Sequence, residues 1–156
     1  GRPHSVMAYG VQDSERIWRH TKAVVTYQDG RQALAIGSHL MPESYPFTSV
    51  IRVIGEKATA EYRFTAEGTH AERNTETRQN QLTVYHSIDS KNGVCDEIVP
   101  VEFMDPYECQ LRYFIDCIQR GIPVQRGTPV QARRALAIAL AANKSMVKGS
   151  VEPVQD

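Results

Sequence analysis

The sequence of 156 residues lacks an excess of charge of either sign, because its 18 basic and 18 acidic residues cancel. Proteins that bind nucleic acid or an anionic membrane usually carry a basic field. The composition therefore predicts neither nucleic acid nor a membrane as a partner. No apolar run approaches the roughly 20 residues of a membrane span, and no signal peptide is recognisable.

Cysteine is scarce, and the three cysteines show no C-x-x-C spacing. Two of them, Cys109 and Cys117, fall on one predicted helix and lie too far apart along it to form a disulfide. With Cys95 they make an odd set. The pattern predicts reduced thiols and a cytoplasmic protein.

Motifs that carry chemistry are also missing. There is no G-x-G-x-x-G and no P-loop, so nothing predicts a dinucleotide or phosphate site. The five histidines show no H-x-x-x-H spacing, which argues against a metal site. Ser38 precedes His39, but adjacent strand residues point to opposite faces and cannot form a nucleophile–base pair. We therefore expect no catalytic, cofactor-binding or metal-binding residue in this chain.

The first two thirds of the sequence has the period of β-strands. Residues 58–64 show it most clearly, because small and aromatic residues alternate with Thr59, Glu61 and Arg63. Asp29-Gly30 predicts a β-hairpin with a tight primed turn. Pro100 cannot donate a ladder hydrogen bond, which predicts an edge strand there. The expected strands are residues 5–11, 23–28, 32–40, 48–54, 58–64, 81–86 and 97–101.

The last third has the period of helices. Asp105 with Pro106 predicts a capped start, and Gly121 an end. Thr128-Pro129 predicts the start of a second helix, which ends at Gly149. The change from strand to helix near residue 104 predicts an α+β fold, with an open, mostly antiparallel sheet and the two C-terminal helices packed on one face. Residues 65–80 have almost no apolar content and predict a long surface excursion.

Two residues are candidate substrate contacts. His39 is predicted to share a strand face with three small residues, Ala33, Ala35 and Gly37, which leaves space in front of it. Tyr45 lies in a loop bracketed by two prolines and could reach a ligand. The alternative for His39 is a sheet contact with its nitrogens hydrogen-bonded, and for Tyr45 it is simple packing. Asn143, on the second helix, is interpreted as a buried amide that holds a loop backbone.

The order of elements resembles the C-terminal domain of the glucose–fructose oxidoreductase / inositol dehydrogenase / MocA (Gfo/Idh/MocA) family. The matching residues are scattered over nearly the whole chain. They are Gly1-Arg2-Pro3 with Val6 and Ala8, Val24 to Gly30, Val53-Ile54-Gly55, Tyr113-Phe114 with Ile118, Gly121 and Pro123, and Leu136, Ala139, Ala142 and Ser145 with Gly149 and Val151.

The resemblance implies an upstream Rossmann domain that binds NAD or NADP and is absent from residues 1–156. Hydride transfer would act on a sugar, polyol or related small-molecule substrate. The open sheet face would form a dimer or tetramer, so the partners would be the protein's own Rossmann domain and further copies of itself. The family's catalytic residues belong upstream, and the isolated chain is expected to be inactive. The alternative is a stand-alone, non-catalytic α+β ligand-binding or dimerisation module.

Overall fold

A computed structural model describes residues 1–66, 79–86, 96–102 and 104–155. The polypeptide divides into two compact units, Gly1–Met41 with Tyr113–Asp156 (unit 1) and Pro42–Arg112 (unit 2). Each unit contains one four-stranded sheet in which all neighbouring strands are antiparallel. The predicted α+β class with open antiparallel sheet is confirmed, and the strands are divided between two sheets.

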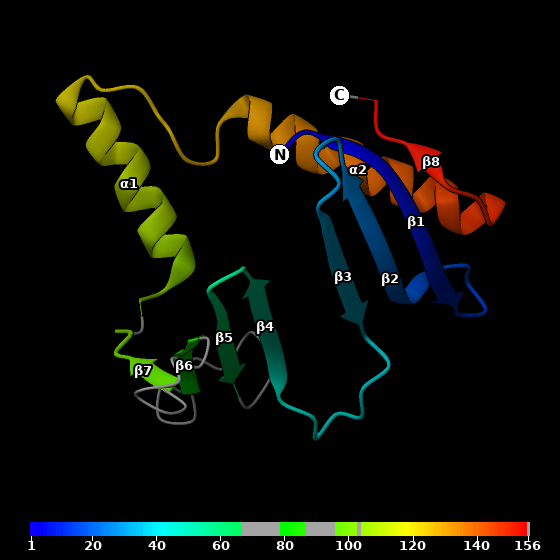
Figure 1. The fold of residues 1–156 in the computed structure, drawn as a ribbon, viewed down its shortest axis with the longest axis horizontal. Coiled ribbons are helices and arrows are strands. Elements are labelled where there is room, and N and C mark those ends of the chain that lie inside the picture. The colour runs from blue at the N-terminus through cyan, green and yellow to red at the C-terminus, as the bar shows by residue number, and fades with distance from the viewer. Residues whose placement is uncertain (67–78, 87–95, 103, 156) are drawn as a thin grey trace. The chain divides into compact units, whose positions relative to one another are not determined.

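Unit 1 combines the first three strands with the C-terminal part of the chain, and its sheet has the order β3-β2-β1-β8. Helix α2 packs on β1, and β8 pairs with β1 on the side opposite β2 (Figure 1). The sequence did not reveal β8, because this strand has only two residues and one of them is proline. The elements of unit 1 are β1 (Pro3–Gln12), β2 (Trp18–Tyr27), β3 (Gln32–Ser38), α2 (Pro129–Lys148) and β8 (Glu152–Pro153).

The turn between β2 and β3 confirms the predicted hairpin but differs from it in type. Tyr27 N–H donates to the Arg31 carbonyl at 2.9 Å, which encloses a loop of three residues rather than two. Gly30 has a φ of 83°, the left-handed conformation that completes such a loop. Gly30 occupies the left-handed position of a three-residue loop, so the predicted two-residue primed turn is not formed.

The core of unit 1 lies between the sheet and α2. Val6, Ala8 and Val25 from the sheet are buried together with Ala141 from α2. Val6 and Ala8 are two residues apart and therefore point to the same face of β1. The small side chain of Ala141 allows the helix to approach the sheet closely.

Gly10 lies on the same face of β1, at the point where the side chains of Trp18 and Met146 lie over the strand. A Cβ on Gly10 would lie 2.6 Å from Cε3 of Trp18 and 2.7 Å from the sulfur of Met146. Both separations are below ordinary van der Waals contact, so only glycine fits beneath these side chains without a shift. The indole N–H of Trp18 also donates to Oδ1 of Asn143 at 3.0 Å. Asn143 is exposed and bonds a side chain, so its interpretation as a buried amide holding a loop backbone is wrong.

Helix α2 has the caps that its sequence predicts. Thr128 accepts a hydrogen bond from the Gln131 N–H, and the Gln131 side chain accepts one from the Thr128 N–H. This reciprocal pair satisfies two of the amide donors that a helix start leaves open. At the other end Gly149 has a φ of 68° and donates to the Ser145 carbonyl at 2.8 Å.

Unit 2 contains a sheet with the order β4-β5-β6-β7. Its β7 strand is an edge, as the proline at position 100 predicts. The strands are β4 (Phe47–Ile54), β5 (Ala58–Ala66), β6 (Gln79–His86) and β7 (Asp96–Val99). Residues 65–66 and 79–80 belong to β5 and β6, and the rest of the predicted polar excursion lies outside the described residues.

The register gives the sheet of unit 2 two different faces, because paired residues of antiparallel strands point the same way. One face carries ion pairs from Arg52 and Arg63 to Glu61, together with the exposed side chains of Val50, Ile54 and Ile98. The other face is more apolar and includes Phe47, Ile51, Val53, Ala60, Tyr62, Phe64, Leu82, Val84 and Val99. The alternation predicted for residues 58–64 is therefore confirmed.

Helix α1 (Pro106–Arg120) spans the division between the two units, which falls before Tyr113. Asp105 caps it by accepting from the N–H groups of Tyr107 and Glu108, as its sequence predicts. The apolar stripe of α1 is exposed, whereas Cys117 is buried. The stripe consists of Tyr107, Leu111, Phe114, Ile115 and Ile118.

Candidate functional site

His39 directly follows β3 in unit 1. Its backbone N–H donates to the Arg19 carbonyl at 2.7 Å, which continues the β2–β3 ladder by one residue beyond the strand. The residue is exposed, so the imidazole is accessible to a ligand. Its position at the end of the ladder fixes the backbone while leaving the ring free of the core.

Tyr45 belongs to unit 2 and lies in a turn before β4. Its N–H donates to the Pro42 carbonyl at 2.8 Å, and the residue is 49% exposed. The two proline residues and this bond restrict the loop, as the sequence indicates. His39 belongs to unit 1 and Tyr45 to unit 2.

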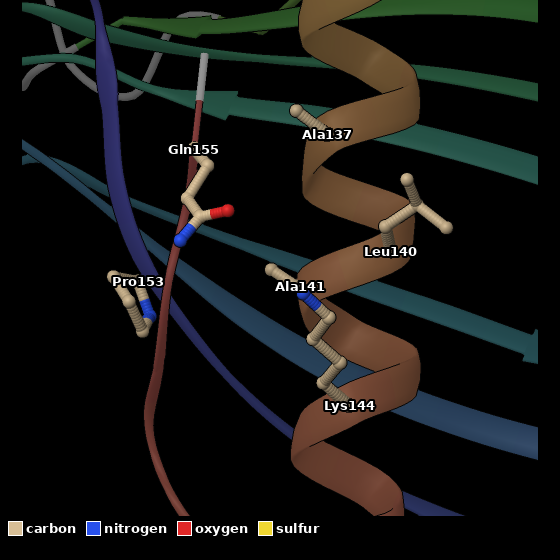
Figure 2. Close-up of a pocket in the computed structure, with 6 residues that line it drawn as sticks. All are labelled: Ala137, Leu140, Ala141, Lys144, Pro153 and Gln155. Carbon is tan, nitrogen blue, oxygen red and sulfur yellow. The ribbon is translucent and has the colours of Figure 1, made fainter.

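A small cavity lies in unit 1 between α2 and the C-terminal segment (Figure 2). Its volume is about 80 Å³, far below the roughly 300–1,000 Å³ of a site for a cofactor or drug-sized ligand. Lys144 supplies its only charged lining side chain. The other lining residues are Ala137, Leu140, Ala141, Pro153 and Gln155. A nucleotide or sugar does not fit this cavity.

The carboxylates with shifted pKa values are held in their charged form. Hydrogen bonds from the Arg31 side chain lower the pKa of Asp29 to about 2. The Arg52 guanidinium lowers the pKa of Glu61, and the Lys148 ammonium lowers that of Glu152. For Asp13 the largest cause of the lowered pKa is the backbone N–H of Ile17. A general acid or base needs a pKa near the operating pH, and the lowered pKa values of these carboxylates do not favour that role.

The described residues contain no cluster of three or more His, Cys, Asp or Glu side chains that could hold a metal ion. Within the same part of the chain, no helix is both long enough and apolar enough to cross a membrane. Cys109 and Cys117 are free thiols, and Cys95 lies outside the described residues.

The larger accessible feature of unit 1 is the sheet face opposite α2. In the register of the sheet, Lys22 lies between Tyr9 of β1 and Ile36 of β3. Val24 lies next to Leu34, and all five residues are on this face. Leu34 is 65% exposed and Ile36 is 61% exposed. Leu34 and Ile36 alternate with Ala33, Ala35 and Gly37 in the sequence, which places them together on one face of their strand. The sequence did not reveal that β1 and β2 continue this row, because their own alternation is interrupted by Lys22 and Gly10.

The sequence also did not predict the contacts of the C-terminal segment, which includes Ser150 and Glu152. The Ser145 side chain is fully buried, and its Oγ accepts from Ala8 N–H at 2.9 Å and donates to the Ser150 carbonyl at 2.6 Å. Lys148 forms an ion pair with Glu152 at 2.9 Å. A serine that points to the core from an Ala-rich helix is the only sequence signal for this clamp, which joins α2, β1 and the C-terminal segment.

Comparison with known proteins identifies the fold. No protein-family model and no curated protein matches the chain. Among solved structures, UDP-N-acetylglucosamine 3-dehydrogenase GnnA from Acidithiobacillus ferrooxidans has a TM-score of 0.71 at 24% identity, over 92% of this chain and 40% of that one. Aldose-aldose oxidoreductase from Caulobacter crescentus, solved with glycerol, has a TM-score of 0.66 at 12% identity, over 97% and 41%.

A third similar structure is the WlbA dehydrogenase from Bordetella pertussis, in complex with NADH and UDP-GlcNAcA. Its TM-score is 0.59 at 19% identity, over 100% of this chain and 40% of that one. The chain thus spans about two fifths of the length of each of these oxidoreductases. The resemblance to the C-terminal domain of the Gfo/Idh/MocA family is confirmed at the level of the fold.

Proposed function

We propose that this chain is the substrate-binding and oligomerisation domain of an NAD(P)-dependent oxidoreductase. The observation that carries the proposal is the extent of the likeness. Nearly the whole chain matches about two fifths of GnnA, of WlbA and of the aldose-aldose oxidoreductase. The remaining three fifths of such an enzyme are long enough for a Rossmann domain, which is where the missing G-x-G-x-x-G would lie.

The proposed reaction is hydride transfer between a nicotinamide and a sugar, polyol or related carbon. GnnA is named as a dehydrogenase of a sugar nucleotide, and WlbA was solved in complex with one. The third similar protein is named as an aldose-aldose oxidoreductase. The nicotinamide would be bound by the Rossmann domain, since the cavity described in unit 1 is too small for it. The free thiols of Cys109 and Cys117 support a cytoplasmic location.

In this function His39 and Tyr45 contribute to the substrate pocket. Both are exposed, and in both the backbone is held by a hydrogen bond while the side chain is accessible. In the complete enzyme, His39→Ala and Tyr45→Phe are expected to raise KM for the substrate. His4→Ala, at another exposed histidine, is the matched control and should leave KM unchanged. Unaltered KM in both variants would remove these residues from the pocket.

The first test of the function is the reading frame that encodes the chain. A strand followed by G-x-G-x-x-G, and an E-K-P motif just before Gly1, are expected upstream. A start codon immediately before Gly1 would instead favour the second candidate, a stand-alone binding or dimerisation module. The observation that favours this alternative is that unit 1 has a hydrophobic core of its own.

A further inference from the structure

The two hairpin loops of unit 1 have the same backbone form. In the loop between β1 and β2, Asp13 N–H donates to the Ile17 carbonyl at 3.1 Å. The Arg16 N–H donates back to the Asp13 carbonyl, also at 3.1 Å. In the loop between β2 and β3, the matching bond runs from Gly30 N–H to the Tyr27 carbonyl at 3.0 Å. Arg16 and Gly30 therefore occupy equivalent positions in the two loops.

Arg16 is an unfavourable residue for its position. It has a φ of 61° and is the only non-glycine residue with a positive φ in the described part of the chain. Gly30 adopts the same left-handed conformation, with a φ of 83°, and lacks the Cβ that makes it strained. Backbone strain of this kind is concentrated at ligand-binding and catalytic sites. We therefore expect the Arg16 side chain to have a role that glycine cannot fill.

Asp13 fixes both this loop and a second arginine. Its Oδ1 accepts from the N–H groups of Glu15 and Ile17, both at 2.9 Å. Its Oδ2 accepts from Nε of Arg19 at 2.6 Å, and the Arg19 guanidinium has no other partner within unit 1. The two Nη groups of Arg19 thus remain as a preorganised fork. Such a fork binds two oxygens of a carboxylate or phosphate side by side.

Arg19 lies at a β-bulge next to His39. Strand β1 pairs with His20 and with Trp18 but has no residue opposite Arg19. Bulges re-aim a side chain and are frequent beside active sites. On its other side Arg19 is the cross-strand neighbour of His39, whose N–H donates to the Arg19 carbonyl at 2.7 Å. The Cβ atoms of such neighbours lie roughly 4.5–5.5 Å apart, so the arginine is next to a candidate substrate residue.

We propose that the loop between β1 and β2 is an oxyanion-binding site, in which Arg16 and Arg19 bind a carboxylate or phosphate group of the substrate beside His39. This deepens the function proposed above and rests on it. The substrate is then a sugar, polyol or related molecule that carries a negatively charged group. The Nη fork of Arg19, held by Asp13, supplies the bidentate contact, and Arg16 supplies a second positive charge.

A titration of the chain followed by amide NMR signals tests the site directly. The probes are sodium phosphate, sodium glucuronate and neutral glucose, with sodium chloride keeping the ionic strength constant. We expect saturable shifts of the Glu15, Arg19 and His39 amide signals with at least one of the two anions, and none with glucose. A response to only one anion identifies the charged group as a phosphate or as a carboxylate. No response to either anion would overturn the proposal.

Substitutions separate a ligand contact from a structural role. Arg16→Gly removes the side chain and the strain together, so it should raise the midpoint of urea unfolding while weakening anion binding by at least about fivefold. Gly30→Arg is the matched control in the equivalent loop, where a Cβ would meet nothing within 4 Å. It should lower the midpoint and leave anion binding unchanged. Arg19→Lys keeps the charge but loses the planar fork, and should weaken binding by roughly tenfold. Glu15→Gln should not weaken it.

Each outcome decides the proposal. A more stable Arg16→Gly that binds the anion less tightly supports it. An Arg16→Gly that is less stable than the wild type would show a structural contact instead, and unchanged anion binding in both arginine variants would remove the site. The titration involves no nucleotide, so its failure leaves the proposed hydride transfer standing. Conversely, a reading frame without an upstream Rossmann sequence refutes hydride transfer whatever the anions do.

Discussion

Replacement of Ser145 by alanine tests the clamp that holds α2, β1 and the C-terminal segment together. The Ser145 Oγ is fully buried and bonds to two backbone groups, the Ala8 N–H and the Ser150 carbonyl. Alanine fits the same space but offers neither an acceptor nor a donor. Both backbone groups would lose this partner, and Ala8 is itself only 1% exposed.

The magnitude follows from the burial of the two groups. A buried amide left without a partner costs about 1–3 kcal/mol. The Ser150 carbonyl is only partly buried, and losing its bond costs about 0.5–1.5 kcal/mol, because water can replace Ser145 in part. The free energy of unfolding should therefore fall by roughly 1.5–4.5 kcal/mol in Ser145→Ala. For a chain of this length that corresponds to a melting temperature lower by roughly 3–18 °C.

Urea unfolding followed by circular dichroism measures this difference, with an unchanged m value as the check that the folded state is intact. Ser150→Ala is the matched control. It removes a side-chain hydroxyl that donates to Glu152 at 3.2 Å but keeps the Ser150 carbonyl, so it should cost less than about 1 kcal/mol. Equal stability losses in the two variants would refute the role assigned to Ser145.

Three further predictions concern local features. Gly10→Ala should lower the free energy of unfolding in urea by roughly 1–3 kcal/mol, because the new Cβ would collide with Trp18 and Met146. Gly37→Ala is the control: its Cβ would have only Thr21 Oγ1 nearby, at 3.6 Å, so this variant should be equally stable or more stable. Equal effects would contradict the packing. Thr128→Ala should cost about 1 kcal/mol by loss of the α2 cap, with a loss of helical ellipticity on heating at lower temperature. Asp29 has a pKa lowered from 3.8 to about 2, so its stabilising contribution is complete above 3.8 and is lost as pH falls from 3.8 towards 2. The stability difference between the wild type and Asp29→Asn should shrink over that interval, and a difference independent of pH would exclude the Arg31 pair as its source.

Periodicity and caps were sufficient to predict every described helix and strand except β8. Residues 58–64 alternate so regularly that the strand and its apolar face followed directly, and Asp105 and Thr128 located both helix starts. These signals are local: a strand period and a helix cap each depend on residues within a few positions. The same reasoning predicted the β2–β3 hairpin but not the length of its loop, because Asp-Gly is compatible with two-residue and three-residue turns.

Pairings between distant residues could not be predicted. Nothing near Ser145 indicates that its hydroxyl bonds to Ala8, which is 137 positions away. Asn143 was wrongly interpreted as buried because its neighbours on the helix are apolar. Its partner, the Trp18 indole, comes from a strand that a single sequence does not orient. The division of the strands into two sheets likewise depends on pairings that periodicity does not specify.

The candidate site was predictable only as far as the family resemblance extends. His39 and Tyr45 are each accessible and held by a backbone hydrogen bond, but they lie in different units. Their role as substrate contacts stays a prediction. The predicted lack of catalytic residues rests on the missing sequence motifs alone and also stays a prediction.

The measurement that tests the central claim most directly is a calorimetric titration with NADH and with NADPH, made on the isolated chain and on the complete product of its gene. The complete product should bind one of the two nucleotides, and the isolated chain should bind neither. Tight binding by the isolated chain, or no binding by a complete product that folds, would contradict the proposal that this chain is the C-terminal domain of an NAD(P)-dependent oxidoreductase.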